Sequence, residues 1–209
     1  SDEATGDFIL ADITVTECSN AAFTTESTTV YGSTCTEDSN GVTPTVLVAV
    51  DKYTDAMGND NTVSNTYTWT YDTADPTMVI SSTGSLTADG GTSNVAAFAL
   101  SFTSNEPTTN FAAADITVTG GDDCALSALT AQTTVLYTAT CTRSDGETGN
   151  VVVAASTYTD EAGNDNAVSN VFDWTYDGTD PTMVITSTGS LTADGGTTGV
   201  AAFALTFTS

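Results

Sequence analysis

One stretch of the sequence occurs twice, and this repetition constrains the possible folds more than any other feature. Residues 53–80 read YTDAMGNDNTVSNTYTWTYDTADPTMVI, and residues 158–185 read YTDEAGNDNAVSNVFDWTYDGTDPTMVI. The two copies begin 105 positions apart. Near-identity at a fixed spacing of this kind is typical of a tandem array, so the chain is expected to consist of repeated units.

The stretch from residue 72 to residue 176 holds one complete repeat, in which apolar and polar residues alternate as in strands covered on one face. A short strand near Cys124 to Leu126 would bring the total to seven, with turns rich in Gly, Asn, Asp and Pro between them. Seven short strands in about 105 residues predict an all-β, immunoglobulin-like β-sandwich with essentially no helix, rather than a jelly roll or a β-helix. The alternating positions are Met78 and Ile80; Phe98, Leu100 and Phe102; Ile116 and Val118; Val135, Tyr137, Ala139 and Cys141; Val151, Val153 and Ala155; and Phe172, Trp174 and Tyr176.

The register of the repeat predicts three domains in a circularly permuted order. Residues 1–71 match the complete unit without its first two strands, and residues 177–209 match those two strands alone. A two-stranded hairpin is marginal by itself, and an incomplete sandwich leaves apolar side chains open to solvent. The open face of the first domain would carry Ile13, Val15, Tyr67 and Trp69.

Two interpretations fit the partial domains equally well. In the first, residues 181–209 of one subunit insert into the N-terminal domain of the next, so that head-to-tail strand complementation builds an open filament. The inserting strands would present Met183, Ile185, Phe203, Leu205 and Phe207. In the second, the residues are two periods of a longer array, in which neighbouring repeats complete each other covalently.

The charge of the chain limits its partners. Lys52 and Arg143 are its two basic residues, against 27 acidic ones and no histidine, and the formal net charge is −25. Such a surface repels nucleic acid and anionic membranes, whose binding depends on Lys and Arg. Its negative charges must be solvated, screened or bridged by cations. No apolar run of the length of a membrane span occurs, and the sequence does not open with a signal peptide.

The four cysteines repeat the same spacing. Cys18 and Cys35 are 17 positions apart, as are Cys124 and Cys141. Because the chain has no C-x-x-C pattern and no histidine to complete a zinc site, we expect one disulfide in each repeat rather than free buried thiols. Disulfides place the protein outside the cell or at the cell surface.

Nothing in the sequence favours catalysis. Without histidine there is no Ser-His-Asp or Cys-His arrangement, and no glycine-rich loop leads from a strand into a helix to hold phosphate. Trp69 and Trp174 alternate with other aromatic residues along a strand, so packing is a better interpretation than sugar binding. Asn-x-Ser/Thr sequons are absent, whereas O-linked carbohydrate on the many Thr and Ser residues is compatible with the sequence.

The order of motifs resembles a known family. The segments FTSNEPTTNFAAADITVTGG, VLYTATCT, VVVAASTYTDEAGNDNAVSN and WTYDGTDPT follow one another as in the bacterial-type Ig-like repeats of large surface adhesins and extracellular fibre proteins. The resemblance implies β-sandwich domains strung in series on a cell-surface or secreted fibre. The cysteine pair departs from the usual repeat.

Acidic and amide residues gather at the expected joints between domains. Oxygen ligands in such number suit Ca²⁺, which the resemblance also favours, although the spacing is not that of an EF-hand. The alternative is that these residues are turn formers with solvated side chains. The candidate ligands are Asp55, Asn59, Asp60, Asp72, Asp75, Glu106, Asp115, Asp160, Asn164, Asp165, Asp177 and Asp180.

Two functions follow from these patterns. The first is a structural subunit of an extracellular filament or surface stalk, assembled head-to-tail from copies of itself. The second is a calcium-stiffened segment of a long cell-surface adhesin, which binds a host, surface or carbohydrate ligand elsewhere. The near-identity of the repeats argues against a specialised adhesive tip within this stretch.

Overall fold

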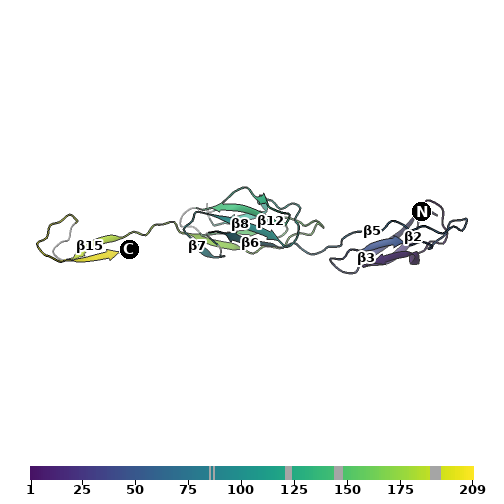
Figure 1. Ribbon diagram of the computed structural model, residues 1–209, viewed down its shortest axis with the longest axis horizontal. Helices are drawn as coiled ribbons and strands as arrows, with labels where there is room; N and C mark the ends of the chain where they lie inside the picture. Colours follow the sequence, from purple (N-terminus) through teal and green to yellow (C-terminus); the bar gives the residue numbers. More distant parts are fainter. Residues whose placement is uncertain (85, 87, 121–123, 144–147, 189–193) are drawn as a thin grey trace.

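The computed structural model describes residues 1–84, 86, 88–120, 124–143, 148–188 and 194–209. Figure 1 shows three parts in a row, an N-terminal part, a central two-sheet unit and a C-terminal hairpin, joined by extended linkers. In this described part of the chain, regular structure consists of strands and two short 3-10 turns, η1 (Leu10–Asp12) and η2 (Ala113–Asp115). No helix among these residues has the length and apolar character needed to span a membrane.

The central unit consists of two facing sheets. The first sheet has the order β10-β12-β8-β6, and β11 also pairs with β12. The second has the order β7-β14-β13-β9, in which β7 and β14 are parallel and the other pairs antiparallel. The strands are β6 (Met78–Thr83), β7 (Gly91–Ser93), β8 (Ala97–Ser104), β9 (Ile116–Thr119), β10 (Ala125–Leu126), β11 (Thr130–Ala131), β12 (Leu136–Thr142), β13 (Thr148–Val153) and β14 (Phe172–Tyr176).

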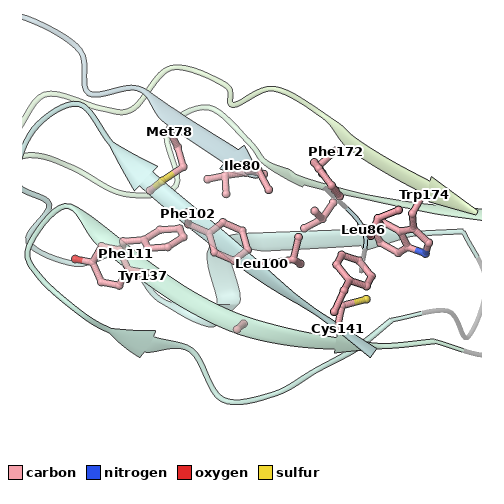
Figure 2. Packing of buried hydrophobic residues seen from close by; sticks show 14 of the residues in the cluster. Met78, Ile80, Leu86, Leu100, Phe102, Phe111, Tyr137, Cys141, Phe172 and Trp174 are labelled. Atoms are coloured by element: carbon pink, nitrogen blue, oxygen red, sulfur yellow. The ribbon is translucent and has the colours of Figure 1, made fainter. Parts of the chain in front are cut away.

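The core of the central unit lies between these sheets (Figure 2). Every second residue of β6 is buried, because successive side chains of a strand point to opposite faces. The predicted all-β fold is therefore confirmed, and each of the seven predicted strands is present. Val135 and Ala155 lie just outside β12 and β13. The core residues are Met78, Ile80, Leu86, Phe98, Leu100, Phe102, Phe111, Tyr137, Ala139, Cys141, Val151, Val153, Tyr158, Phe172 and Trp174.

The N-terminal part, residues 1–71, forms a three-stranded sheet and a separate hairpin. The sheet has the order β1-β4-β5, with β1 (Ile13–Thr16), β4 (Thr45–Val48) and β5 (Tyr67–Thr68), and the hairpin joins β2 (Cys18–Thr25) to β3 (Tyr31–Glu37). Phe8 packs edge-to-face against three rings, with centroid distances of 5.6, 5.0 and 5.1 Å to Phe23, Tyr31 and Tyr53. All four rings are only half-buried.

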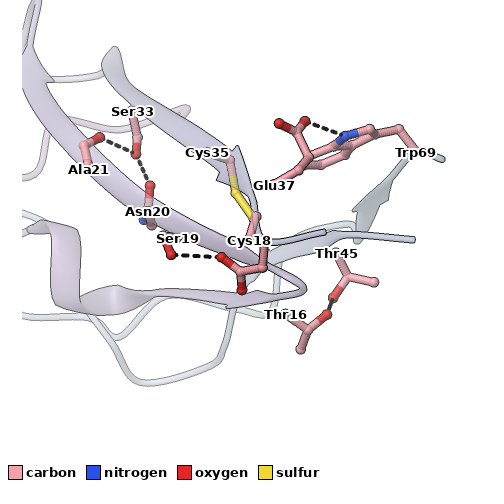
Figure 3. Close-up of a disulfide and its surroundings, with 11 residues drawn as sticks. Thr16, Cys18, Ser19, Asn20, Ala21, Ser33, Cys35, Glu37, Thr45 and Trp69 are labelled. Atoms are coloured by element: carbon pink, nitrogen blue, oxygen red, sulfur yellow. Dashed lines mark hydrogen bonds between the residues drawn. A yellow bond between two sulfur atoms is a disulfide. The ribbon is translucent and has the colours of Figure 1, made fainter. Parts of the chain in front are cut away.

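The face expected to be open in this part carries Ile13, Val15, Tyr67 and Trp69. Tyr67 is 66% exposed, and the other three side chains are half-buried. Trp69 donates its indole N–H to Glu37 at 3.0 Å (Figure 3). The apolar core of the chain's described residues lies in the central unit.

The C-terminal part is a two-stranded hairpin of β15 (Val184–Thr188) and β16 (Ala204–Thr208). Its register repeats that of β6 and β8: Ile185 pairs with Phe207 as Ile80 pairs with Phe102. No further sheet covers either face of this hairpin in the described residues, so its apolar side chains are exposed.

Both predicted disulfides are present, and no cysteine is free. Cys18–Cys35 joins β2 to β3 in the N-terminal part (Figure 3), and Cys124–Cys141 joins the residue before β10 to β12. Each bond closes a loop with a sequence separation of 17.

Candidate metal centre at the domain joint

The linker that enters the central unit is held against one of its loops. The side-chain amide of Asn164 donates to the backbone carbonyl of Asp72 at 3.1 Å. Further along the linker, the carbonyl of Pro76 accepts the N–H of Ala167 at 2.9 Å. The linker is thus fixed to the segment between β13 and β14 before it continues into β6.

Three carboxylates meet where the linker contacts the central unit. Asp72 belongs to the linker, Glu106 follows β8, and Asp160 lies between β13 and β14. One carboxylate oxygen from each lies within 4.8 Å of the others. Asp160 is 4% exposed, and Asp72 and Glu106 are half-buried.

Hydrogen bonds within its loop keep Asp160 ionised. One carboxylate oxygen accepts the backbone N–H groups of Gly163 and Asn164 at 2.7 and 2.9 Å, and the other accepts the Asn164 side chain at 2.9 Å. Burial alone would raise the pKa of Asp160 and is the largest single influence, but the hydrogen bonds together outweigh it and leave the pKa below its ordinary value.

The pKa of Glu106 is shifted in the opposite direction. Burial, followed by the negative charges of Asp72 and Asp160, raises its pKa above the ordinary value of 4.5. Ionising all three carboxyls therefore has a free-energy cost, which a bound cation would offset.

The donor set fits a hard cation. All three groups offer oxygen, the ligand atom that Ca²⁺ prefers at roughly 2.3–2.6 Å. Ligands on opposite sides of one such ion stand about 5 Å apart by the same distances, and the three oxygens lie within 4.8 Å of one another. Calcium takes six to eight ligands, so backbone carbonyls or waters would complete the shell.

The N-terminal part carries a related pair of carboxyls. Glu3 and Asp55 occupy the positions of Glu106 and Asp160 in the repeat. A hydrogen bond with Asp55, and then its charge, raises the pKa of Glu3. Asp55 has a pKa of about 2, chiefly because the backbone and side chain of Asn59 donate to it, each at 2.8 Å.

Sequence reasoning missed Glu3. The signal was available, because Ser-Asp-Glu at residues 1–3 aligns with Ser-Asn-Glu at 104–106. In the same register, the counterpart of Asp72 is Asp177, which belongs to the linker before the C-terminal hairpin.

Several of the predicted ligands do not belong to this triad. Asp115 accepts the backbone N–H of Ala112 at 2.8 Å and caps η2. Asn164 orients Asp160 and the linker, as Asn59 orients Asp55. The structure does not bring the remaining candidates into the triad; they are Asp60, Asp75, Asp165, Asp177 and Asp180.

Two facing sheets of short strands, with a linker bound at one end, define the central unit as an Ig-like β-sandwich module. The bacterial Ig-like domain model matches residues 72–176, which is 105 of the 209 residues, and the chain belongs to this family. It is a non-catalytic fold family. No curated protein sequence matches the chain.

Proposed function

We propose that the protein is a structural subunit of an extracellular filament or surface stalk, assembled head-to-tail by strand complementation between Ig-like domains. The observation that carries this proposal is the contrast between two near-identical hairpins. Strands β6 and β8 are buried in the central unit, whereas β15 and β16, of matching sequence and register, are not covered.

The apolar side chains that face the core in the first hairpin differ in exposure from their counterparts in the second. Ile80 and Phe102 are 2% and 0% exposed, and their counterparts Ile185 and Phe207 are both 60% exposed. The same holds for Met183, Phe203 and Leu205 against Met78, Phe98 and Leu100. Burying such side chains contributes about 1.5–3 kcal/mol each, so the hairpin strongly favours a covering surface.

The N-terminal part offers that surface. Its β3 corresponds to β12, which pairs with β8 along its full length in the central unit. Residues 1–71, all of them described, contain no counterpart of β6 or β8, and β3 pairs with β2 alone. A second copy of the chain can therefore add its β15–β16 hairpin beside β3 by β-augmentation.

A pocket of about 300 Å³ lies in the N-terminal part where the hairpin would insert. Phe8, Tyr31, Val48 and Tyr53 are among the residues that line it. Phe8 corresponds to Phe111, which packs against Phe102 with the ring centroids 5.9 Å apart. The repeat register thus supports insertion of Phe207 of the incoming hairpin into this pocket.

The test is assembly of the purified 209-residue chain with and without residues 181–209. Electron microscopy and sedimentation should find filaments or head-to-tail oligomers for the full chain and not for the truncated one. Fibres formed by the truncated chain would rule out strand complementation.

We propose in addition that Ca²⁺ binds Asp72, Glu106 and Asp160 and stiffens the joint. The ion would bridge the linker to the central unit, since Asp72 belongs to the first and the other two residues to the second. The idea fails if a chelator changes neither the melting temperature nor the end-to-end length of the chain.

The proposed location is outside the cell or on its surface. Both disulfides and the membership of a family typical of surface proteins support it. The principal partner is a second copy of the chain, and O-linked carbohydrate on Thr and Ser is compatible with this setting. Nucleic acid and membrane insertion do not form part of the proposal, given the net charge of −25.

The alternative function is a calcium-stiffened segment of a long adhesin. The same repeat register supports it, because a following repeat in one continuous chain would complete the sandwich covalently. An aromatic-lined ligand groove unique to one repeat would favour this alternative.

A further inference from the structure

The outer edge of β6 is bound by a single side chain. Strand β6 lies at the edge of its sheet, and Asn170 pairs with both backbone groups of Ile80 there. The N–H of Ile80 donates to Asn170 Oδ1 at 2.7 Å, and Asn170 Nδ2 donates to the Ile80 carbonyl at 3.0 Å. One amide thus replaces the neighbouring strand that Ile80 lacks on this side.

The loop that presents Asn170 is built by a fixed set of hydrogen bonds. Asn166 Oδ1 accepts the N–H groups of Thr157 and Tyr158 at 2.8 and 2.9 Å. Ser169 Oγ accepts the N–H of Val153 at 2.9 Å and donates to the carbonyl of Asn170 at 2.7 Å. The position of Asn170 is therefore determined by its own loop and by β13.

The N-terminal part contains the same loop with the same bonds. Asn61 Oδ1 accepts the N–H groups of Lys52 and Tyr53 at 2.7 and 3.0 Å. Ser64 Oγ accepts the N–H of Val48 at 2.9 Å and donates to the carbonyl of Asn65 at 2.7 Å. Asn65 is thus held as Asn170 is.

The two loops differ in what the side-chain amide of Asn65 or Asn170 binds. Among the described residues, the side chain of Asn65 has no hydrogen-bond partner, although the structure around it matches that of Asn170. The residue that would match Ile80 is Ile185, since both occupy the same register position in their hairpins.

We propose that Asn65 is a clamp that binds the outer edge of the β15–β16 hairpin of a second copy of this chain. Its side-chain amide binds the backbone N–H and C=O of Ile185 of that copy, while Phe207, paired opposite Ile185, enters the pocket lined by Phe8 and Tyr31. This inference rests on the proposed head-to-tail assembly and adds a residue that fastens the inserted hairpin.

The clamp and the pocket act on different registers. A slip of one residue turns every apolar side chain to the other face, and it also turns the backbone N–H and C=O of β15 away from Asn65. A slip of two residues keeps the apolar face inward and gives Asn65 the equivalent backbone groups of another residue, but it takes Phe207 out of the pocket. The clamp therefore holds the edge of the hairpin, and the pocket selects the register.

The experiment compares the full 209-residue chain with Asn65→Ala, Asn65→Asp and a control, Asn94→Ala. Asn94 is exposed, and its counterpart in the other hairpin is Gly199, so alanine there is expected to be neutral. Sedimentation across a concentration series gives the apparent Kd of the head-to-tail contact. Hydrogen exchange gives the protection of the Ile185 amide.

Asn65→Ala should raise the apparent Kd about tenfold, which corresponds to ~1.4 kcal/mol. It should also remove the protection of the Ile185 amide. Asn65→Asp should weaken assembly at least as much, because a carboxylate accepts the N–H of Ile185 but opposes its carbonyl oxygen. Asn94→Ala should match the unaltered chain in both measurements.

The outcomes separate the two proposals. If the unaltered chain stays monomeric at all concentrations, head-to-tail assembly and the clamp both fail. If it assembles, and Asn65→Ala assembles equally with the same Ile185 protection, the clamp is wrong and the filament stands. Far-UV circular dichroism and the unfolding of the central unit verify that each variant is folded.

Discussion

Asn164 donates a hydrogen bond of 3.1 Å to the backbone carbonyl of Asp72, a residue 92 positions earlier in the chain. The same amide nitrogen also donates to Asp160 at 2.9 Å. One side chain therefore couples the path of the linker to the orientation of a carboxylate in the candidate metal centre. The bending of the joint and the geometry of the cation site are linked as a result.

Calcium should stabilise the chain through the triad. At a concentration one hundred times its Kd, a ligand that binds only the folded state adds about 2.7 kcal/mol to the free energy of unfolding. Calorimetry with Ca²⁺ and with chelator should give a higher melting temperature with Ca²⁺. Glu106→Gln should reduce that difference, and Asp75→Asn, which changes an exposed carboxylate outside the triad, should preserve it. Equal responses in both variants would argue against the site.

Without divalent cations, the stability of the joint should depend on the ionisation of Glu106. Its pKa is raised in the folded state, so its contribution is complete below the ordinary value of 4.5 and is lost as the pH rises through the raised value. In chelator, Glu106→Gln should therefore be more stable than the unaltered chain at pH 7 and similar to it near pH 4. Denaturant midpoints across this pH range provide the measurement. Parallel curves for the two proteins would contradict the expectation.

The ionisation of Asp160 should stabilise the central unit, in contrast to that of Glu106. Its folded-state pKa is lowered, so it stabilises the unit above its ordinary value of 3.8, and this contribution disappears as the pH falls through the lowered value. Asp160→Asn should consequently flatten the acid limb of the stability profile. Measurements from pH 5 down to pH 2 test this, and an unchanged acid limb would show that other carboxyls dominate.

Phe207→Asp should abolish head-to-tail assembly. The change places a charge where the counterpart Phe102 is fully buried, and an unpaired buried charge costs several kcal/mol. Thr208→Asp is the matched control, because its counterpart Thr103 is exposed on the same strand of the central unit. Mass photometry or sedimentation should find monomers for the first variant and oligomers for the second. Assembly of Phe207→Asp would exclude the pocket as its binding site.

Gly149→Ala should destabilise the central unit by about 1–3 kcal/mol through overpacking. A Cβ at this position would lie 2.6 Å from Trp174 Cζ2 and 3.2 Å from the carbonyl of Thr119. Gly199→Ala serves as a control, since nothing lies within 4 Å of the Cβ there. Guanidinium unfolding followed by tryptophan fluorescence reports the free-energy difference. A Gly149→Ala chain as stable as the control would mean that Trp174 can move aside.

Much of the central sandwich could be predicted because its strands are covered on one face. In β6 and β8, burial alternates with the same period as the apolar residues of the sequence. Strand β7 was not predicted, because Gly91, Thr92 and Ser93 do not show the alternation of apolar and polar residues that marks a strand. It forms because tertiary packing brings it beside β14, with which it pairs in parallel.

The residue types of the candidate site could be predicted from the sequence, but the individual residues that form it could be predicted only in part. The register located Asp72, Glu106 and Asp160 near one joint, but Asp115 lies in the same stretch and caps a turn instead. Nothing in the sequence indicated that Asn170 binds the edge of a strand. A single asparagine in a loop is usually interpreted as a turn former. The hydrogen bonds of Asn170 depend on a strand that lies 90 positions earlier in the chain.

The parallel pairing of β7 with β14 has a mechanical consequence. Tension along the chain enters the central unit through the linker before β6 and leaves it after β14, and Figure 1 places these two connections at opposite ends of the unit. Pulling then loads the antiparallel β6–β8 pairs next to the entry point and, beyond them, the parallel pairs Trp174–Gly91, Thr175–Thr92 and Tyr176–Ser93, which resist sliding of β7 past β14 in shear. A unit loaded in this way resists extension until such contacts rupture as a group.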